Sequence, residues 1–199
     1  MNNNKAKIVP VLADVADIRI GYPFRGKIDF DVAGSIPVIQ LRNFATDLSL
    51  APAPLLAVKQ LPAADRHALQ EGDVLYASKG ERNFAFAVPA TLRGAIPASY
   101  FFVLHARTPE VLPEYLAWYL NQPPAKNFLR SHAVRGTHMP VIPKSIFEQC
   151  PITVPPLAIQ RAIIKLDELR RAEKHLTEKL DAAKAKLVAM LSLRAADAI

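Results

Sequence analysis

The sequence predicts an α+β fold, in which one mixed, strand-rich domain is followed by a long C-terminal coiled-coil helix. Short β-rich segments punctuated by Gly and Pro fill most of the first 105 residues. Sixteen of the 17 prolines precede Pro156, and none follows it. The charged segment after Pro156 repeats apolar residues every seven positions, which is typical of a coiled-coil seam.

Strands are predicted where runs of β-branched and aromatic residues lie between turn residues. The pair Gly72-Asp73, for example, is a turn signal that leads directly into an apolar run. The predicted strands are residues 36–41, 72–77, 84–88 and 100–104.

Three helices are predicted in the same domain: residues 63–70, residues 113–121 and a third that begins near Pro124. The second is the more amphipathic, and its aromatic residues recur at helical spacing. This spacing favours a place in the core over a ligand platform.

The domain boundary is predicted in the proline-rich run at residues 151–156. Val154-Pro155-Pro156 cannot continue a strand ladder, because proline has no backbone N–H, whereas Pro156 suits the first turn of a helix. We therefore expect two domains, residues 1–153 and residues 154–199.

The helix after this boundary is predicted to space or join other parts. Its 39 residues from Pro156 to Arg194 would form a rod of about 58 Å, longer than a helix that caps a small domain. Glu173 is the only interior misfit in the heptad pattern. The predicted seam consists of Ile159, Ala162, Leu166, Leu169, Leu176, Leu180, Ala183, Leu187 and Met190.

Charge gives a weaker indication of the partner. The formal net charge is +7, and Lys and Arg outnumber Asp and Glu by nine to six in residues 155–199 and by 16 to 12 before them. A basic chain suits a polyanion such as nucleic acid, but any soluble basic protein would show the same balance.

The single cysteine, Cys150, excludes an internal disulfide and a zinc site built on thiolates. It favours an intracellular protein. The sequence has no apolar run of membrane-spanning length, and its polar start does not resemble a signal peptide. We therefore expect a cytoplasmic protein that makes no contact with membranes.

Catalysis is not expected, and neither is a cofactor or metal. Seven scattered glycines form no phosphate-binding loop. Gln122-Pro123-Pro124-Ala125 lacks the Asn or Asp and the aromatic residue that an amino-methyltransferase tetrad needs. No Glu-x-Lys or Asp-x-Lys sequence of a metal-dependent nuclease occurs, and the five histidines have no zinc-site spacing.

Several motifs resemble a known family when they are taken in order. Pro155-Pro156-Leu157, followed by Gln160, resembles the junction that leads into the conserved helix of specificity subunits of type I restriction-modification systems. Further segments resemble parts of that family's target recognition domain. These segments are residues 20–24, residues 34–39, residues 72–75 with Gly80, and Gly136-Thr137 with residues 142–144.

The resemblance implies a noncatalytic subunit that recognises double-stranded DNA and recruits methyltransferase subunits and, in some systems, a translocating nuclease (restriction) subunit. Typical members carry two recognition domains and two conserved helices, whereas this chain has one of each and looks like a half-size form. We therefore expect a homodimer with antiparallel C-terminal helices, which would read a gapped palindromic site.

DNA contacts are expected on three loops and one lysine, because Arg can grip guanine and Asn adenine in the major groove. For each loop residue, a solvated side chain is an equally open interpretation. Lys144 is assigned to a phosphate. The loop candidates are Gln40, Arg42 and Asn43; Lys79, Arg82 and Asn83; and Arg135, Thr137 and His138. The alternative function is a coiled-coil assembly or adaptor protein whose body binds a protein partner and not DNA.

Overall fold

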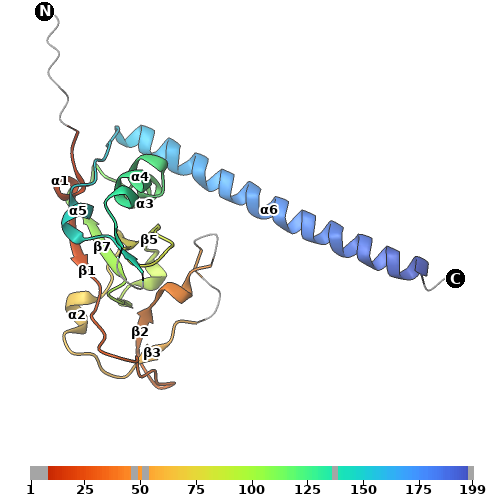
Figure 1. Ribbon diagram of the computed structural model, residues 1–199, viewed down its shortest axis with the longest axis horizontal. Helices are drawn as coiled ribbons and strands as arrows, with labels where there is room; N and C mark the ends of the chain where they lie inside the picture. Colours follow the sequence, from red (N-terminus) through yellow and green to blue (C-terminus); the bar gives the residue numbers. More distant parts are fainter. Residues whose placement is uncertain (1–8, 46–48, 51–53, 136–138, 197–199) are drawn as a thin grey trace, which may run out of the picture. The chain divides into compact units, whose positions relative to one another are not determined.

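The computed structural model describes residues 9–45, 49–50, 54–135 and 139–196. The chain divides into two compact units, residues 1–160 and residues 161–199. The α+β class expected from the sequence is confirmed, with sheets in the first unit and a long helix at the C-terminus (Figure 1).

A four-stranded antiparallel sheet forms the centre of the first unit. Its two middle strands are buried on both faces, so their sequences are nearly continuous apolar runs. Successive side chains point to opposite faces and therefore enter two separate cores. The strands are, in order across the sheet, β1 (Ala16–Ile20), β7 (Phe101–Ala106), β4 (Asp73–Ala77) and β5 (Ala85–Ala87).

The first core lies between one face of this sheet and four helices. Tyr76 and Phe102 point to this face, and their rings lie 4.5 Å and 4.9 Å from the ring of Phe147. Figure 1 shows α3 and α4 at one end of this unit and β2 and β3 at the other. The helices are α1 (Leu12–Val15), α3 (Pro113–Leu120), α4 (Pro123–Ser131) and α5 (Lys144–Glu148).

The second core covers the opposite face and contains Leu75, Phe101 and Val103. Phe44 lies at its centre, with its ring 5.0 Å from that of Phe84 and 5.7 Å from that of Phe101. The short elements of this part are β2 (Ile36–Ile39), η1 (Leu41–Asn43), β3 (Ala57–Val58), α2 (Ala64–His67), η2 (Ala90–Leu92) and β6 (Ile96–Pro97).

The predicted strands are confirmed as β2, β4, β5 and β7, each with slightly different ends. The helices predicted at residues 113–121 and from Pro124 are α3 and α4. The helix predicted at residues 63–70 is only the single turn α2. It ends early because Leu69 pairs with residues of another segment: its N–H donates to Ala95 O, and its carbonyl accepts from Gly94 N, both at 2.9 Å.

The predicted C-terminal helix is confirmed as α6 (Leu157–Ala196), whose first turn belongs to the first unit. Every residue from 168 to 196 is exposed. Ion pairs one turn apart support the helix, such as Lys174 with Glu178 at 3.8 Å. No helix in the described part of the chain is both long enough and apolar enough to cross a membrane.

Asp73 is the most deeply buried carboxylate of the first unit, with a side chain only 2% exposed. It accepts a hydrogen bond of 2.6 Å from Arg19 Nη2 and one of 3.0 Å from Gln70 N, and it lies 2.9 Å from His105 Nδ1. A buried charge is tolerated only with such partners. Asp73 therefore ties β1, β4 and β7 together at one end of the sheet.

Replacing Asp73 with Ala should lower the free energy of unfolding by about 2–3 kcal/mol, because the Gln70 N–H and the Arg19 guanidinium lose their acceptor. This loss of stability should be smaller than that for a fully buried ion pair, since the Arg19 side chain is 34% exposed. Urea denaturation would measure it. Asp17→Ala, which removes an exposed pair with Arg107, is the control and should change little. Equal losses in the two variants would contradict this account.

Candidate nucleic-acid interface

The turn between β4 and β5 contains three of the predicted contact residues, Lys79, Arg82 and Asn83. Gly80 adopts φ +100°, a conformation that other residues rarely adopt, so this sharp turn requires glycine. Asn83 Nδ2 donates a hydrogen bond of 2.9 Å to Ala77 O and closes the turn. The conformation of this loop is therefore set by residues of the turn itself.

The segment that carries Arg135 lies against this turn. Arg135 is in β8 (Val134–Arg135), which pairs with β9 (Pro140–Val141). Gly80 N donates to Pro140 O at 2.9 Å, and Lys79 forms a bridge with Val141. Two of the three predicted loops are therefore neighbours. Thr137 and His138 lie outside the described residues.

The third loop is attached through Arg82. Its Nη2 donates to Phe44 O at 3.1 Å and to Ala45 O at 3.0 Å, directly after η1. Within this loop Asn43 Oδ1 accepts a hydrogen bond of 2.7 Å from Gln40 N. We call residues 40–45, 79–83, 134–135 and 139–141 the three-loop cluster.

Three cations of the three-loop cluster, Arg42, Lys79 and Arg82, form no ion pair with a described carboxylate. The Arg42 guanidinium lies 5.2 Å from the centre of the Phe30 ring, and Lys79 Nζ lies 5.5 Å from the centre of the Tyr100 ring. The charge of all three cations is therefore available to an external anion, and Arg82 keeps the N–H groups of Nε and Nη1 for one.

Asn43 and Asn83, two of the predicted contact residues, each form a side-chain hydrogen bond within their own turn. Lys144 starts α5, and its ammonium pairs with Glu148 at 3.0 Å. Sequence reasoning missed two aromatic residues beside the cations, Phe30 and Tyr100. No local pattern indicates them, because strand β2 separates Phe30 from Arg42 and Tyr100 lies in a segment that reads as a strand.

The predicted seam lies entirely on α6, and all nine of its residues are exposed. Leu166 is 70% exposed and Leu176 is 65% exposed. An apolar stripe of this length is unusual on a chain that stays alone in water. No group of His, Cys, Asp and Glu that could hold a metal ion occurs among the described residues.

No family model and no curated protein matches the sequence of this chain. Comparison with solved structures, in contrast, finds several proteins of similar fold, and three of them illustrate the likeness. The HsdS subunit from Thermoanaerobacter tengcongensis has a TM-score of 0.66 at 20% identity over 90% of this chain. The S subunit of a type I restriction-modification system from M. genitalium has a TM-score of 0.55 at 14% identity over 85%.

The third similar chain comes from a structure that concerns complex assembly and conformational transition of the type I R-M system, with a TM-score of 0.63 at 19% identity over 95% of this chain. The chain thus has the fold of type I specificity subunits. It spans less than half of each of these proteins, between 40% and 46% of their length.

Replacing Arg82 with Ala should loosen the loop at residues 41–45, because two hydrogen bonds to its carbonyls are lost. Amide hydrogen exchange of Phe44 and Ala45 should accelerate by about five- to thirtyfold, which corresponds to about 1–2 kcal/mol of local stability. Arg93→Ala is the control, since this exposed side chain forms no hydrogen bond or ion pair with a described residue. Unchanged exchange in Arg82→Ala would show that Arg82 does not hold the loop.

Proposed function

We propose that this chain is a noncatalytic DNA sequence-recognition subunit of a type I restriction-modification, or related phage-defence, methyltransferase complex. The three-loop cluster carries this proposal, because loops far apart in the sequence meet there and present cations without carboxylate partners. The fold shared with type I specificity subunits supports it. Residues 1–153 would be the target recognition domain, and residues 154–199 the spacer and dimerisation helix.

Within the three-loop cluster, the roles follow from geometry and charge. Lys79 and Arg42 would contact phosphates, since their cations lie over aromatic rings and form no ion pair with a described residue. Arg82 would reach a base, because arginine can grip guanine with two hydrogen bonds, and Arg135 is proposed to do so on the grounds given by the sequence. Gln40, Asn43, Asn83, Thr137, His138 and Lys144 remain proposed contacts on the grounds given by the sequence.

The chain is about half as long as the specificity subunits that it resembles in fold, so a second copy would supply the missing half. The exposed seam of α6 would pair with that of the other copy in antiparallel orientation. Two identical recognition domains related by a twofold axis would read inverted copies of one short sequence. The full site would then be a gapped palindrome.

The complex would include methyltransferase subunits and, in a complete system, a restriction subunit. The similar structure that concerns assembly of the type I R-M system supports such partners. Catalysis would reside in those subunits and not in this chain. A DNA partner would place the chain in the cytoplasm.

An adaptor protein that binds another protein is the second candidate function, favoured only by the exposed stripe on α6. The two functions differ in their dependence on salt. Phosphate contacts impose a linear loss of log affinity with log salt concentration, whereas a mainly apolar protein contact does not.

Arg42→Ala and Lys79→Ala should each weaken binding to duplex DNA and reduce the salt slope by about one, because each removes one phosphate contact. Arg82→Ala and Arg135→Ala should cost about 1–3 kcal/mol at the recognised sequence and relax preference at one base position. Fluorescence anisotropy over a salt series would measure both effects in the assembled complex. Arg107→Ala, whose guanidinium already pairs with Asp17, is the control. Wild-type binding that does not depend on salt would favour the adaptor function.

Replacing Leu176 and Leu180 with Asp should give monomers, because charge in a buried seam costs several kcal/mol. Light scattering at micromolar concentration would show the change in mass. Ala185→Asp adds the same charge at a heptad position outside the predicted seam and should leave the dimer intact. A monomeric wild-type chain would contradict the dimer, as would methylation of an asymmetric bipartite site in cells that lack a second specificity chain.

A further inference from the structure

Val134 is an exposed apolar residue within the three-loop cluster. Its side chain is 57% exposed, and it lies directly opposite Val141 in the pair of β8 and β9. Val141 in turn lies opposite Lys79, and this bridge has a backbone hydrogen bond of 2.9 Å on either side. Residues that lie directly opposite one another in neighbouring strands point to the same face. Val134, Val141 and Lys79 therefore form a row on one face.

Two further apolar side chains lie next to this row. Met139, directly before β9, is 39% exposed, and Tyr100, whose ring centre lies 5.5 Å from Lys79 Nζ, is 40% exposed. Single exposed apolar residues are common on protein surfaces, whereas a group of them marks a contact site. We call Val134, Met139, Val141 and Tyr100 the apolar patch.

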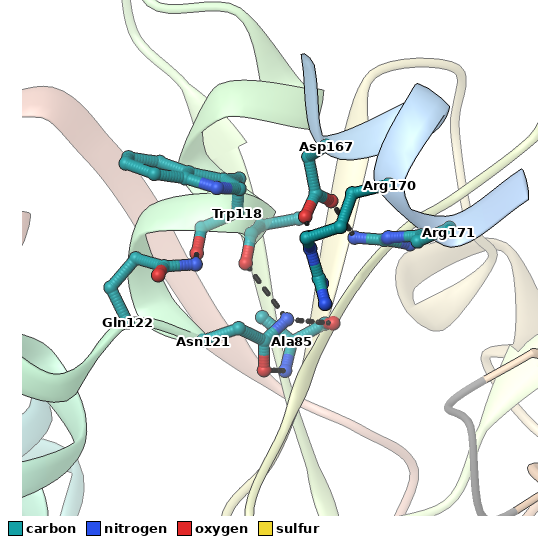
Figure 2. Close-up of polar contacts among 8 residues, drawn as sticks. Ala85, Trp118, Asn121, Gln122, Asp167, Arg170 and Arg171 are labelled. Atoms are coloured by element: carbon teal, nitrogen blue, oxygen red, sulfur yellow. Dashed lines mark hydrogen bonds and ion pairs between the residues drawn. The ribbon is translucent and has the colours of Figure 1, made fainter. Parts of the chain in front are cut away.

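The turn that carries Lys79 is held at both of its ends. At its start, Ser78 donates to Tyr100 O from its backbone N at 2.9 Å and from its Oγ at 3.1 Å. After the turn, Asn121 Oδ1 accepts from Ala85 N at 3.1 Å, and Asn121 Nδ2 donates to Ala85 O at 2.8 Å (Figure 2). A surface that is already ordered loses little conformational entropy when it binds a partner. The apolar patch is therefore suited to specific recognition.

Charge indicates which kind of partner the apolar patch fits. The cations of Lys79, Arg42 and Arg82 lie in the same cluster and form no ion pair with a described residue, so they favour a polyanion over an apolar protein surface. Two paired strands are about 4.8 Å apart, which is narrow enough for the major groove of DNA at about 12 Å. The apolar feature that base pairs display in this groove is the C5 methyl group of thymine. An apolar side chain beside cations therefore matches a thymine methyl group beside phosphates.

We propose that Val134 and Met139 contact the C5 methyl group of a thymine, so that this chain selects an A·T pair at one position of its half-site. This inference rests on the proposed function and deepens it, because it assigns a base to described residues. A G·C pair at the same position would present the amino group of cytosine to side chains that cannot accept its hydrogen bonds, and it would be rejected. Tyr100 supports Lys79, whose cation contacts the phosphate beside that base.

Deoxyuridine tests the methyl contact directly, because it lacks only the C5 methyl group of thymine and keeps the pairing edge. The recognised sequence is first obtained by selection from random duplexes with the chain assembled with its methyltransferase subunits. Each thymine of that sequence is then replaced singly by deoxyuridine, and fluorescence anisotropy measures binding. At one or more positions of the half-site, the wild-type complex should lose about three- to fivefold in affinity, as expected for one buried methyl group.

Variants of the apolar patch assign this loss to its residues. Val134→Ser should bind the thymine and deoxyuridine duplexes equally at one such position, whereas Val134→Ile keeps an apolar side chain and should keep the difference. Val9→Ser changes an exposed valine outside the three-loop cluster and is the matched control. Met139→Gln should reduce the difference as well, and it serves if Val134→Ser does not fold. The ratio of the two affinities within one variant is decisive, because a distorted loop would weaken binding to both duplexes equally.

Full sensitivity to the methyl group in both Val134→Ser and Met139→Gln would overturn the inference. So would a specific site of the wild-type complex in which every thymine can be replaced without loss of affinity. If Val134→Ser keeps its base preference but no longer co-elutes with the methyltransferase subunits in size-exclusion chromatography, the apolar patch binds protein and the inference is also wrong. Failure of the proposed function looks different, because the wild-type complex would then prefer no sequence over random duplex, and the inference would fall with it.

Discussion

Burial of β4 and β7 on both faces is the constraint on which the rest of the first unit depends. A strand pair with apolar side chains on both sides must be covered twice, since exposure of either face would cost about 25 cal/mol for each Å² of apolar surface. Helices α1, α3, α4 and α5 cover one face, and the segments around β2, η1 and η2 cover the other. The loops that leave this sheet are therefore held by two cores, which allows a rigid binding surface to be built from short turns.

The apolar and turn patterns were sufficient to predict the main elements of the fold. The four strand runs and the helix with Tyr115 carry apolar patterns that report burial, and the C-terminal helix carries a heptad pattern. Strand β1 was not predicted, although Ala16–Ile20 alternates apolar and charged residues as a half-buried strand does, and its place is set by pairing with β7. The single turn of α2 was overestimated because pairing of Leu69 with another segment ends it.

The candidate site could be predicted only as separate loops. Turn chemistry and donor types indicated Lys79, Arg82 and the loop of Arg42, but no local signal indicates that Arg82 bonds to Phe44 O. The hydrogen bonds of Gln160, whose side chain is buried, were equally hidden. Two of its three partners, Glu110 and Leu112, lie about 50 residues earlier in the chain, so a motif can mark the position without explaining it. Hydrogen bonds between a single side chain and residues distant in the chain cannot be predicted from a sequence pattern.

The exposed apolar stripe of α6 links the stability of this helix to what covers it. An isolated helix with an uncovered apolar stripe is only marginally stable in water, and most helical stability comes from packing against a partner. If two copies complete each other, far below the dissociation constant the population of paired helices grows with the square of the chain concentration. The fraction of chains whose apolar stripe is covered would then rise steeply with the concentration of the chain.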